Sequence, residues 1–176
     1  MYMDCMEFFD TVKGRRSIRA FMDKPVEKDK VRRVLEAANS APSAQNLQKY
    51  EIFLMEDRHK IAELESVARQ EFVSKAPAVL VFCARVEKNK VAASKKLLSE
   101  EFPVLDATIA ASYAQLAVTA LGLGSVWVES FDSDKLMEAL GSPDGLIPVV
   151  VMPIGYPAED PEPKPRRKLD DIVHRV

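Results

Sequence analysis

The stretch VLDATIAASYAQLAVTAL, Val104 to Leu121, is nearly free of charge and rich in alanine. A helix with one face in water carries polar and charged side chains on that face, whereas a helix that lacks them is buried on most sides. We therefore expect a helix here at the centre of the fold, with the remaining elements packed around it.

Outward from this helix, the chain alternates between strand and helix patterns. The run AVLVFCA (78–84) is apolar throughout and has the length of a buried strand. Val31, Val34, Leu35 and Ala38 follow the i, i+3, i+4, i+7 spacing of an amphipathic helix. Further strands are expected at YEIFLM (50–55), in GLGSVWVES (122–130) and at LIPVVVMPIG (146–155), further helices near 8–14, 57–68 and 133–140, and a loop at 41–48.

These elements predict an α+β sandwich in a single domain over residues 1–176. A chain of 176 residues with 47% hydrophobic content is long enough to bury a core. After Gly155, four prolines fall within YPAEDPEPKP, a composition that continues neither a helix nor a strand. We expect residues 156–176 to form an extended C-terminal tail that runs over a surface.

The charge balance argues against nucleic acid or an anionic membrane as a partner. The 25 basic and 27 acidic residues give a formal net charge of -2, so no positive field covers the whole domain. No apolar run reaches the length of a membrane span, and Asp4, Glu7 and Asp10 stand where a signal peptide has cations. We expect a cytoplasmic protein without a membrane segment.

The cysteines and histidines show no pattern of a metal or nucleophile site. Cys5 and Cys83 belong to no CxxC pair, and a reducing compartment would keep both as thiols. His59 and His174 lack the spacing of metal ligands. We expect no metal site and no catalytic cysteine.

Two basic clusters lie at opposite ends of this slightly acidic chain. GRRSIRAF (14–21) places three arginines within five positions around a serine, and KPRRK (164–168) lies in the tail. Guanidinium groups match phosphate oxygens, and a serine hydroxyl can bind a further oxygen, so the clusters indicate a phosphorylated ligand if they meet in space. Arginines after a helix are also common as solvated or salt-bridged surface residues, and the clusters alone do not decide between the two.

Five segments together resemble the FMN-dependent nitroreductases, in the order in which that family carries them. These segments are RRSIRAF, PVEKDKVRRVLEAANSAPSAQNLQ, KAPAVLVFCA, ALGLGSVWVESF and IGYPAEDPEPKPRRKL. The resemblance covers nearly the whole chain. It implies a central, mostly antiparallel sheet flanked by helices, in an intertwined homodimer with two FMN sites at the interface.

The resemblance also implies roles for the basic residues. Arg15, Arg16 and Ser17 would bind the phosphate and ribityl chain of FMN, and Arg19 would reach the N1/O2 edge of its ring. A cation at that edge stabilises the negative charge of reduced flavin. From the tail, Arg166, and with it Arg167, would close over the phosphate.

Three further segments are implied to meet the flavin. Pro42, Ser43, Ala44 and Asn46 would come from the partner subunit, and Gln70 would meet the polar edge of the ring. The sequence leaves structural alternatives open, because Pro42 and Ser43 also suit the end of a helix, Trp127 suits core or interface packing, and Gly122 and Gly124 suit a helix cap. The backbone groups near flavin N5 would be those of Val128, Glu129 and Ser130.

The implied activity is hydride transfer from NADH or NADPH through flavin N5 to a small acceptor in a ping-pong reaction, with no catalytic side chain. The acceptor could be a nitroaromatic, a quinone, free flavin or an enone. Departures from the family pattern at Lys49, Tyr50 and Lys168, and a short segment at 85–103, leave the acceptor open and predict an open substrate pocket. The alternative is a non-catalytic module that binds a flavin or phosphorylated ligand for sensing or storage.

Overall fold

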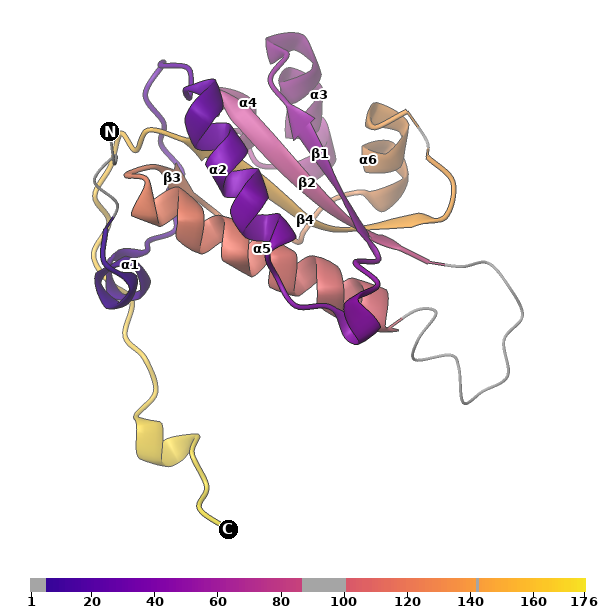
Figure 1. Ribbon diagram of the computed structural model, residues 1–176. Helices are drawn as coiled ribbons and strands as arrows, with labels where there is room; N and C mark the ends of the chain where they lie inside the picture. Colours follow the sequence, from indigo (N-terminus) through magenta and orange to yellow (C-terminus); the bar gives the residue numbers. More distant parts are fainter. Residues whose placement is uncertain (1–5, 87–100, 142) are drawn as a thin grey trace.

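The computed structural model describes residues 6–86, 101–141 and 143–176, and a four-stranded sheet lies at its centre (Figure 1). Its strands stand in the order β1-β2-β4-β3, and each neighbouring pair is antiparallel. The bounds are β1 Tyr50–Met55, β2 Ala78–Arg85, β3 Gly124–Ser125 and β4 Leu146–Gly155.

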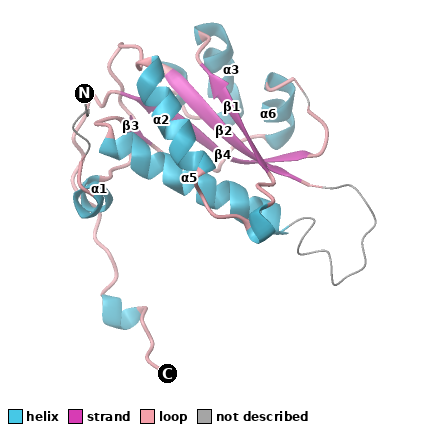
Figure 2. Ribbon diagram, in the orientation of Figure 1, coloured by secondary structure: helices cyan, strands magenta, loops and turns pink. Residues whose placement is uncertain are grey.

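Helices cover both faces of this sheet (Figure 2). One face packs against α2 and α5, and the other against α3, α4 and α6. The helices are α1 Phe8–Gly14, α2 Lys28–Asn39, α3 Arg58–Ala68, α4 Phe72–Lys75, α5 Phe102–Ala120 and α6 Ser133–Ala139. The predicted α+β class, with an antiparallel sheet between helices, is confirmed.

Strand β2 supplies side chains to both cores, which explains its uninterrupted apolar sequence. Leu80 and Phe82 point to the face covered by α2 and α5, whereas Val79 and Val81 point to the face covered by α3 and α6. Successive side chains of a strand alternate between the two faces of a sheet, so a strand covered on both faces is apolar at every position.

Helix α5 is the expected central helix and begins two residues before the predicted start. Pro103 lies in its first turn, where the missing N–H of proline costs no helical hydrogen bond. Its alanines face the sheet and α2, but the side chains of Leu105 and Tyr113 remain 53% and 42% exposed. The helix is thus covered on most sides, as expected, and one face with Leu105 and Tyr113 is uncovered in the single chain.

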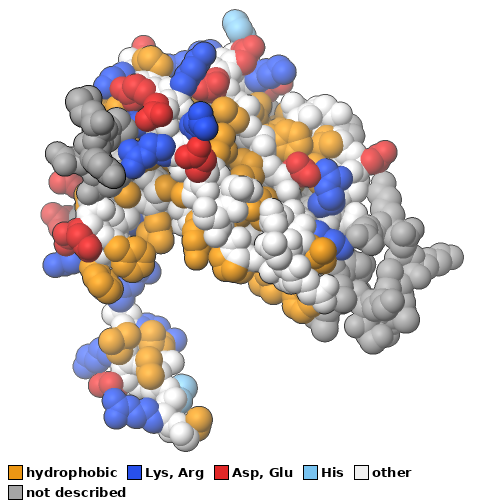
Figure 3. Space-filling model, in the orientation of Figure 1, with side chains coloured by type: hydrophobic (Ala, Val, Ile, Leu, Met, Phe, Trp, Pro, Cys, Tyr) orange, Lys and Arg blue, Asp and Glu red, His pale blue; other side chains and the backbone are white. Residues whose placement is uncertain are grey.

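Helix α1 occurs where the sequence predicts it, and its apolar side chains are also exposed. Phe8 and Phe9 are 60% and 77% exposed. Figure 3 shows apolar side chains on this region, along α5 and on the tail. Among the described helices, none is both long and apolar enough to cross a membrane.

The third strand is shorter than GLGSVWVES predicts, and it has a different neighbour on each edge. Ser125 pairs with Ile154 of β4, and its carbonyl accepts a hydrogen bond of 2.9 Å from the N–H of Ile18. Beyond β3, Val128 forms only an isolated bridge with Val151. At Gly124, a Cβ would lie 2.7 Å from the Ile18 side chain, so this glycine permits close approach of the two segments.

The tail leaves β4 and runs without helix or strand as far as Lys168. Its first residues pair with the segment after Ile18, through hydrogen bonds from Met22 N–H to the carbonyl of Tyr156 and from Ala158 N–H to the carbonyl of Ala20. The tail then projects away from the body and ends after a 3-10 turn, η4, at Leu169–Asp171 (Figure 1).

Candidate functional site

A cleft of about 650 Å³ lies between the end of α1 and the tail. Its volume falls in the range of small-molecule sites, about 300–1,000 Å³. Basic residues from both ends of the chain line it, so the tail brings the two basic clusters of the sequence together. The lining residues are Val12, Lys13, Arg15, Arg16, Ser17, Arg19, Glu159, Pro161, Glu162, Pro163, Lys164 and Arg166.

The fold holds the segment Arg15–Arg19, the arginine fork, by its central apolar residue. Helix α1 ends at Gly14, and Arg15 has the extended angles φ -57° and ψ 130°. Ile18 is only 6% exposed and binds the backbone of β3. With Ile18 buried, the side chains of Arg15, Ser17 and Arg19 lie at the cleft.

The cations of the cleft repel one another. Burial lowers the pKa of Arg15, and the charges of Arg166 and then Arg16 lower it further. Nη1 of Arg16 donates to the carbonyls of Lys13 at 2.7 Å and Arg15 at 3.1 Å, while its buried Nε has no hydrogen-bond partner in the described chain. A cluster of close guanidinium groups with a donor to spare is suited to an anion with several oxygens, such as a phosphate.

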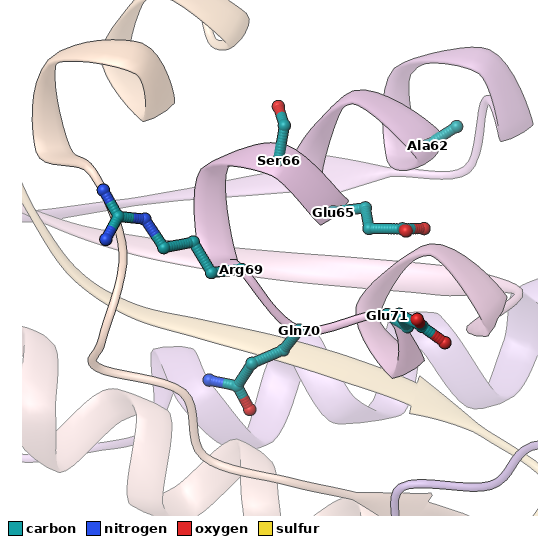
Figure 4. A pocket seen from close by; sticks show the side chains of 6 residues that line it. All are labelled: Ala62, Glu65, Ser66, Arg69, Gln70 and Glu71. Atoms are coloured by element: carbon teal, nitrogen blue, oxygen red, sulfur yellow. The ribbon is translucent and has the colours of Figure 1, made fainter.

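Arg19 lies between the cleft and the first residue of α4, Phe72. Its backbone N–H and that of Ala20 donate to the carboxylate of Glu159, the latter over 3.0 Å. Its guanidinium lies 5.8 Å from the centre of the Phe72 ring. Gln70, two residues before Phe72, lies in a neighbouring surface pocket with Arg69 and not in the cleft (Figure 4).

The loop that carries Pro42, Ser43, Ala44 and Asn46 lies at the far end of α5. The backbone N–H of Ala44 donates to Asp106 near the start of α5, whereas Met6, just before α1, donates to the carbonyl of Ala120 at its end. Fourteen residues of helix separate these two anchors, or about 21 Å. The fold therefore separates this loop from the arginine fork of the same chain.

Val128, Glu129 and Ser130 also lie outside the lining of the cleft. Both backbone polar groups of Val128 bind Val151, with distances of 3.0 Å. The carboxylate of Glu129 accepts a hydrogen bond of 2.6 Å from Trp127 Nε1. The sheet bonds therefore occupy the backbone of Val128. The backbone groups of the exposed Glu129 and Ser130 are not used in these bonds and can contact a ligand.

The tail contributes one predicted arginine and one lysine that the prediction missed. Arg166 lines the cleft, whereas Arg167 donates to the carbonyl of Asp171 over 2.6 Å. Lys164 stands two residues before Arg166 and lines the cleft beside it. The alternation of an extended chain was a signal for Lys164 in the sequence, whereas Lys13 and Glu159 carried no signal that set them apart from other charged residues.

Comparisons with known proteins agree with this architecture. The model of the Nitroreductase family matches residues 12–72 and 61–156. An FMN reductase (NADPH) of Bacillus subtilis is 30% identical, over 94% of this chain and 72% of that protein. An NADH dehydrogenase of Thermus thermophilus is 32% identical, over 90% of this chain and 91% of that protein.

A solved structure extends the agreement to the fold. The FMN-dependent nitroreductase of Clostridium difficile R20291 superposes with a TM-score of 0.79 at 31% identity, over 95% of this chain and 98% of that one. With a family match over most of its length and a relative 32% identical over 90% of the chain, this chain belongs to the nitroreductase family.

Proposed function

We propose that the protein is an NAD(P)H-dependent flavin oxidoreductase that uses FMN as its bound cofactor. Relatives that match nearly the whole chain carry the names FMN reductase, NADPH-dependent oxidoreductase and nitroreductase. The observation that carries the proposal for the site is the convergence of cations from both ends of the chain in one cleft.

The chemistry of the cleft fits FMN. The phosphate would bind between Arg15 and Arg166, where burial and like charge already lower the pKa of Arg15. Lys13, Lys164 and the unpartnered Nε of Arg16 supply further donors, and the hydroxyl of Ser17 suits the ribityl chain. Arg19 follows Ile18 in the chain, whereas the other cleft-lining residues of the arginine fork precede it, and Arg19 would contact the flavin ring.

When bound, FMN supplies a ring that accepts a hydride from NADH or NADPH and passes electrons on to a small acceptor. The chain has to bind and orient this group, and no described side chain is needed as a nucleophile or general acid. In this role Arg19 places a permanent positive charge beside the ring. Nitroaromatics, quinones and free flavin all remain candidate acceptors.

We further propose that the working unit is a homodimer in which each FMN site takes residues from both subunits. The loop of Pro42, Ser43, Ala44 and Asn46 is anchored at Asp106, about 21 Å along α5 from Ala120, where the chain is bound just before α1 and the fork, so these residues would serve the fork of the partner. The exposed apolar faces of α1 and α5 support an interface on this side of the molecule. A two-fold axis would create two equal sites.

The proposed location is the cytoplasm, where NADH and NADPH are supplied. The buried free thiol of Cys83 agrees with a reducing compartment. The net charge of -2 gives no reason to expect a nucleic acid as partner.

Anaerobic reduction tests this function. The purified protein is expected to be yellow, or to become yellow with FMN. It should lose the visible absorbance of oxidised flavin when NADH or NADPH is added. A protein that stays colourless with FMN would contradict the cofactor assignment. A yellow protein that neither nucleotide bleaches would favour the non-catalytic alternative.

A further inference from the structure

The loop at 41–48 is exposed, yet its backbone is held in conformations that residues with side chains rarely adopt. Gln45, Asn46 and Gln48 have φ angles of 53°, 57° and 49°. Such left-handed angles are unfavourable for residues other than glycine and persist only where the surrounding structure fixes them. Residues held in this way cluster at binding and active sites, so the contacts that hold the loop matter for function.

Part of this restraint lies within the loop. The hydroxyl of Ser43 accepts a hydrogen bond of 3.0 Å from the backbone N–H of Gln48. The side-chain amide of Gln48 in turn donates to both the backbone carbonyl and Oδ1 of Asn46, each over 3.0 Å. These bonds set the shape of the loop, but they do not fix its place on the molecule.

Asp106 ties the loop to the central helix. Its Oδ1 accepts a hydrogen bond of 2.9 Å from the backbone N–H of Ala44, and its residue is only 3% exposed. Tyr50 lies close by, since the charge of Asp106 adds to burial in raising the pKa of the Tyr50 hydroxyl. A buried carboxylate is costly to desolvate, so stability alone gives no reason for an acid at this position of α5.

We propose that Asp106 is a positioning residue, which fixes the backbone of Ala44 and thereby presents Ser43 and Asn46 to the flavin at the partner's arginine fork. The proposal rests on the proposed function, in which this loop serves the second subunit. Binding groups have to be held within about 0.5 Å of their working geometry, and a bond from a rigid helix to the middle of the loop provides that restraint.

Three variants test the proposal. Asp106→Ala removes the acceptor, and Asp106→Asn keeps a side-chain oxygen of the same reach without the charge. Ile61→Val is the matched control, because it trims a fully buried side chain in the core on the other face of the sheet. Amide hydrogen exchange reports the Ala44 N–H without flavin, and fluorescence titration reports the affinity for FMN.

The alanine variant is expected to lose about tenfold in Ala44 protection and in FMN affinity, as for one lost hydrogen bond to a charged group. The asparagine variant should stay near the parent in both measurements, and Ile61→Val should lower thermal stability without changing either. An unchanged exchange rate in Asp106→Ala, or an asparagine variant as impaired as the alanine one, overturns the hydrogen-bond anchor. If Asp106→Ala does not fold, the parent protein alone provides the test. An Ala44 amide that exchanges in the parent as fast as in an unstructured peptide also overturns the hydrogen-bond anchor.

Subunit mixing then separates this proposal from the function on which it rests. Asp106→Ala and Arg15→Ala homodimers are unfolded together and refolded, so that half the dimers are heterodimers and about a quarter of all sites combine an intact fork with an intact loop. Tight FMN binding should return in that fraction. Loss of Ala44 protection with unchanged FMN affinity would refute the role of Asp106 toward the flavin, whereas a parent protein that binds no FMN would refute the function on which the proposal rests.

Discussion

At the scale of single residues, Arg15 is the cation on which the phosphate assignment depends most. It is partly buried and lies near two other guanidinium groups, an arrangement that favours a bound anion. Arg15→Ala should therefore cost roughly 1.5–3 kcal/mol of FMN binding, or at least about a tenfold loss of affinity.

Fluorescence titration of the apoprotein measures this loss. Arg32→Ala is a suitable control, because Arg32 lies on α2 in an exposed ion pair with Glu36 and outside the cleft. Equal affinity in Arg15→Ala and the parent would remove Arg15 from the site.

Arg19 should act on the electronics of the flavin more than on its affinity. A guanidinium beside the ring stabilises the charge that reduction places there, so Arg19→Leu should lower the reduction potential of bound FMN. Redox titration against a dye of known potential measures the shift, and Arg58→Leu at the exposed start of α3 serves as the control. An unchanged potential would place Arg19 away from the ring.

Cys83 should be chemically inert in the folded protein. Burial, with a smaller contribution from the charge of Glu51, raises the pKa of its thiol from 9.0 to about 12. In a Cys5→Ser background, a thiol reagent at pH 8 should label the protein only after unfolding in urea. Rapid labelling of the native protein would contradict this burial.

The same pKa shift gives a stability term with a definite sign. The folded state holds the thiol proton more tightly, so the term is fully present below about pH 9 and is lost as the pH rises from 9 toward 12. The parent should therefore lose more stability over this range than Cys83→Ala does.

At the scale of elements, hydrogen bonds hold the start of the tail against the end of the arginine fork. The Glu159 carboxylate accepts from the backbone N–H groups of Arg19 and Ala20, beside the backbone pairing of residues 20–22 with 156–158. Glu159→Ala should loosen the part of the tail that carries Lys164 and Arg166, and so weaken FMN binding. The sheet and its two cores should keep their stability, since Glu159 is exposed.

Glu159→Gln is the matched variant, because both bonds go to the same oxygen and the amide oxygen of Gln can still accept them. FMN titration and urea unfolding of both variants are compared with the parent. An alanine variant that binds FMN as tightly as the parent would show that the backbone pairing and the prolines hold the tail without Glu159.

At the scale of the whole molecule, the sharpest prediction concerns the shared site. Arg15→Ala and Asn46→Ala should each impair both sites of their own homodimer. After joint unfolding and refolding, each heterodimer would collect both lesions in one site and none in the other, so about a quarter of all sites should regain FMN-dependent NAD(P)H oxidation.

Native mass spectrometry provides the necessary check that heterodimers have formed. A mixture with confirmed heterodimers but no more activity than its separate parents would refute the cross-subunit role of Asn46. It would then assign both segments to one chain, against the separation along α5.

Local patterns in the sequence determined most of the elements of this protein. The apolar run of β2, the spacing of Val31, Val34 and Ala38, and the prolines after Gly155 act through the alternation of strands, the period of helices and the fixed φ of proline, which need no distant partner. The arginine fork and KPRRK also indicated a phosphate site on condition that the two clusters meet in space, and the sequence alone left that condition open.

The tertiary structure decided what depends on contacts between distant segments. It limited the third strand to Gly124 and Ser125 and placed Ile18 on its free edge, and it placed Lys13 and Lys164 in the cleft with Arg15. It also set the loop at 41–48 on Asp106, at the opposite end of α5 from the fork. These outcomes depend on which segments far apart in the chain meet, and a local pattern fixes the shape of an element without fixing its neighbours.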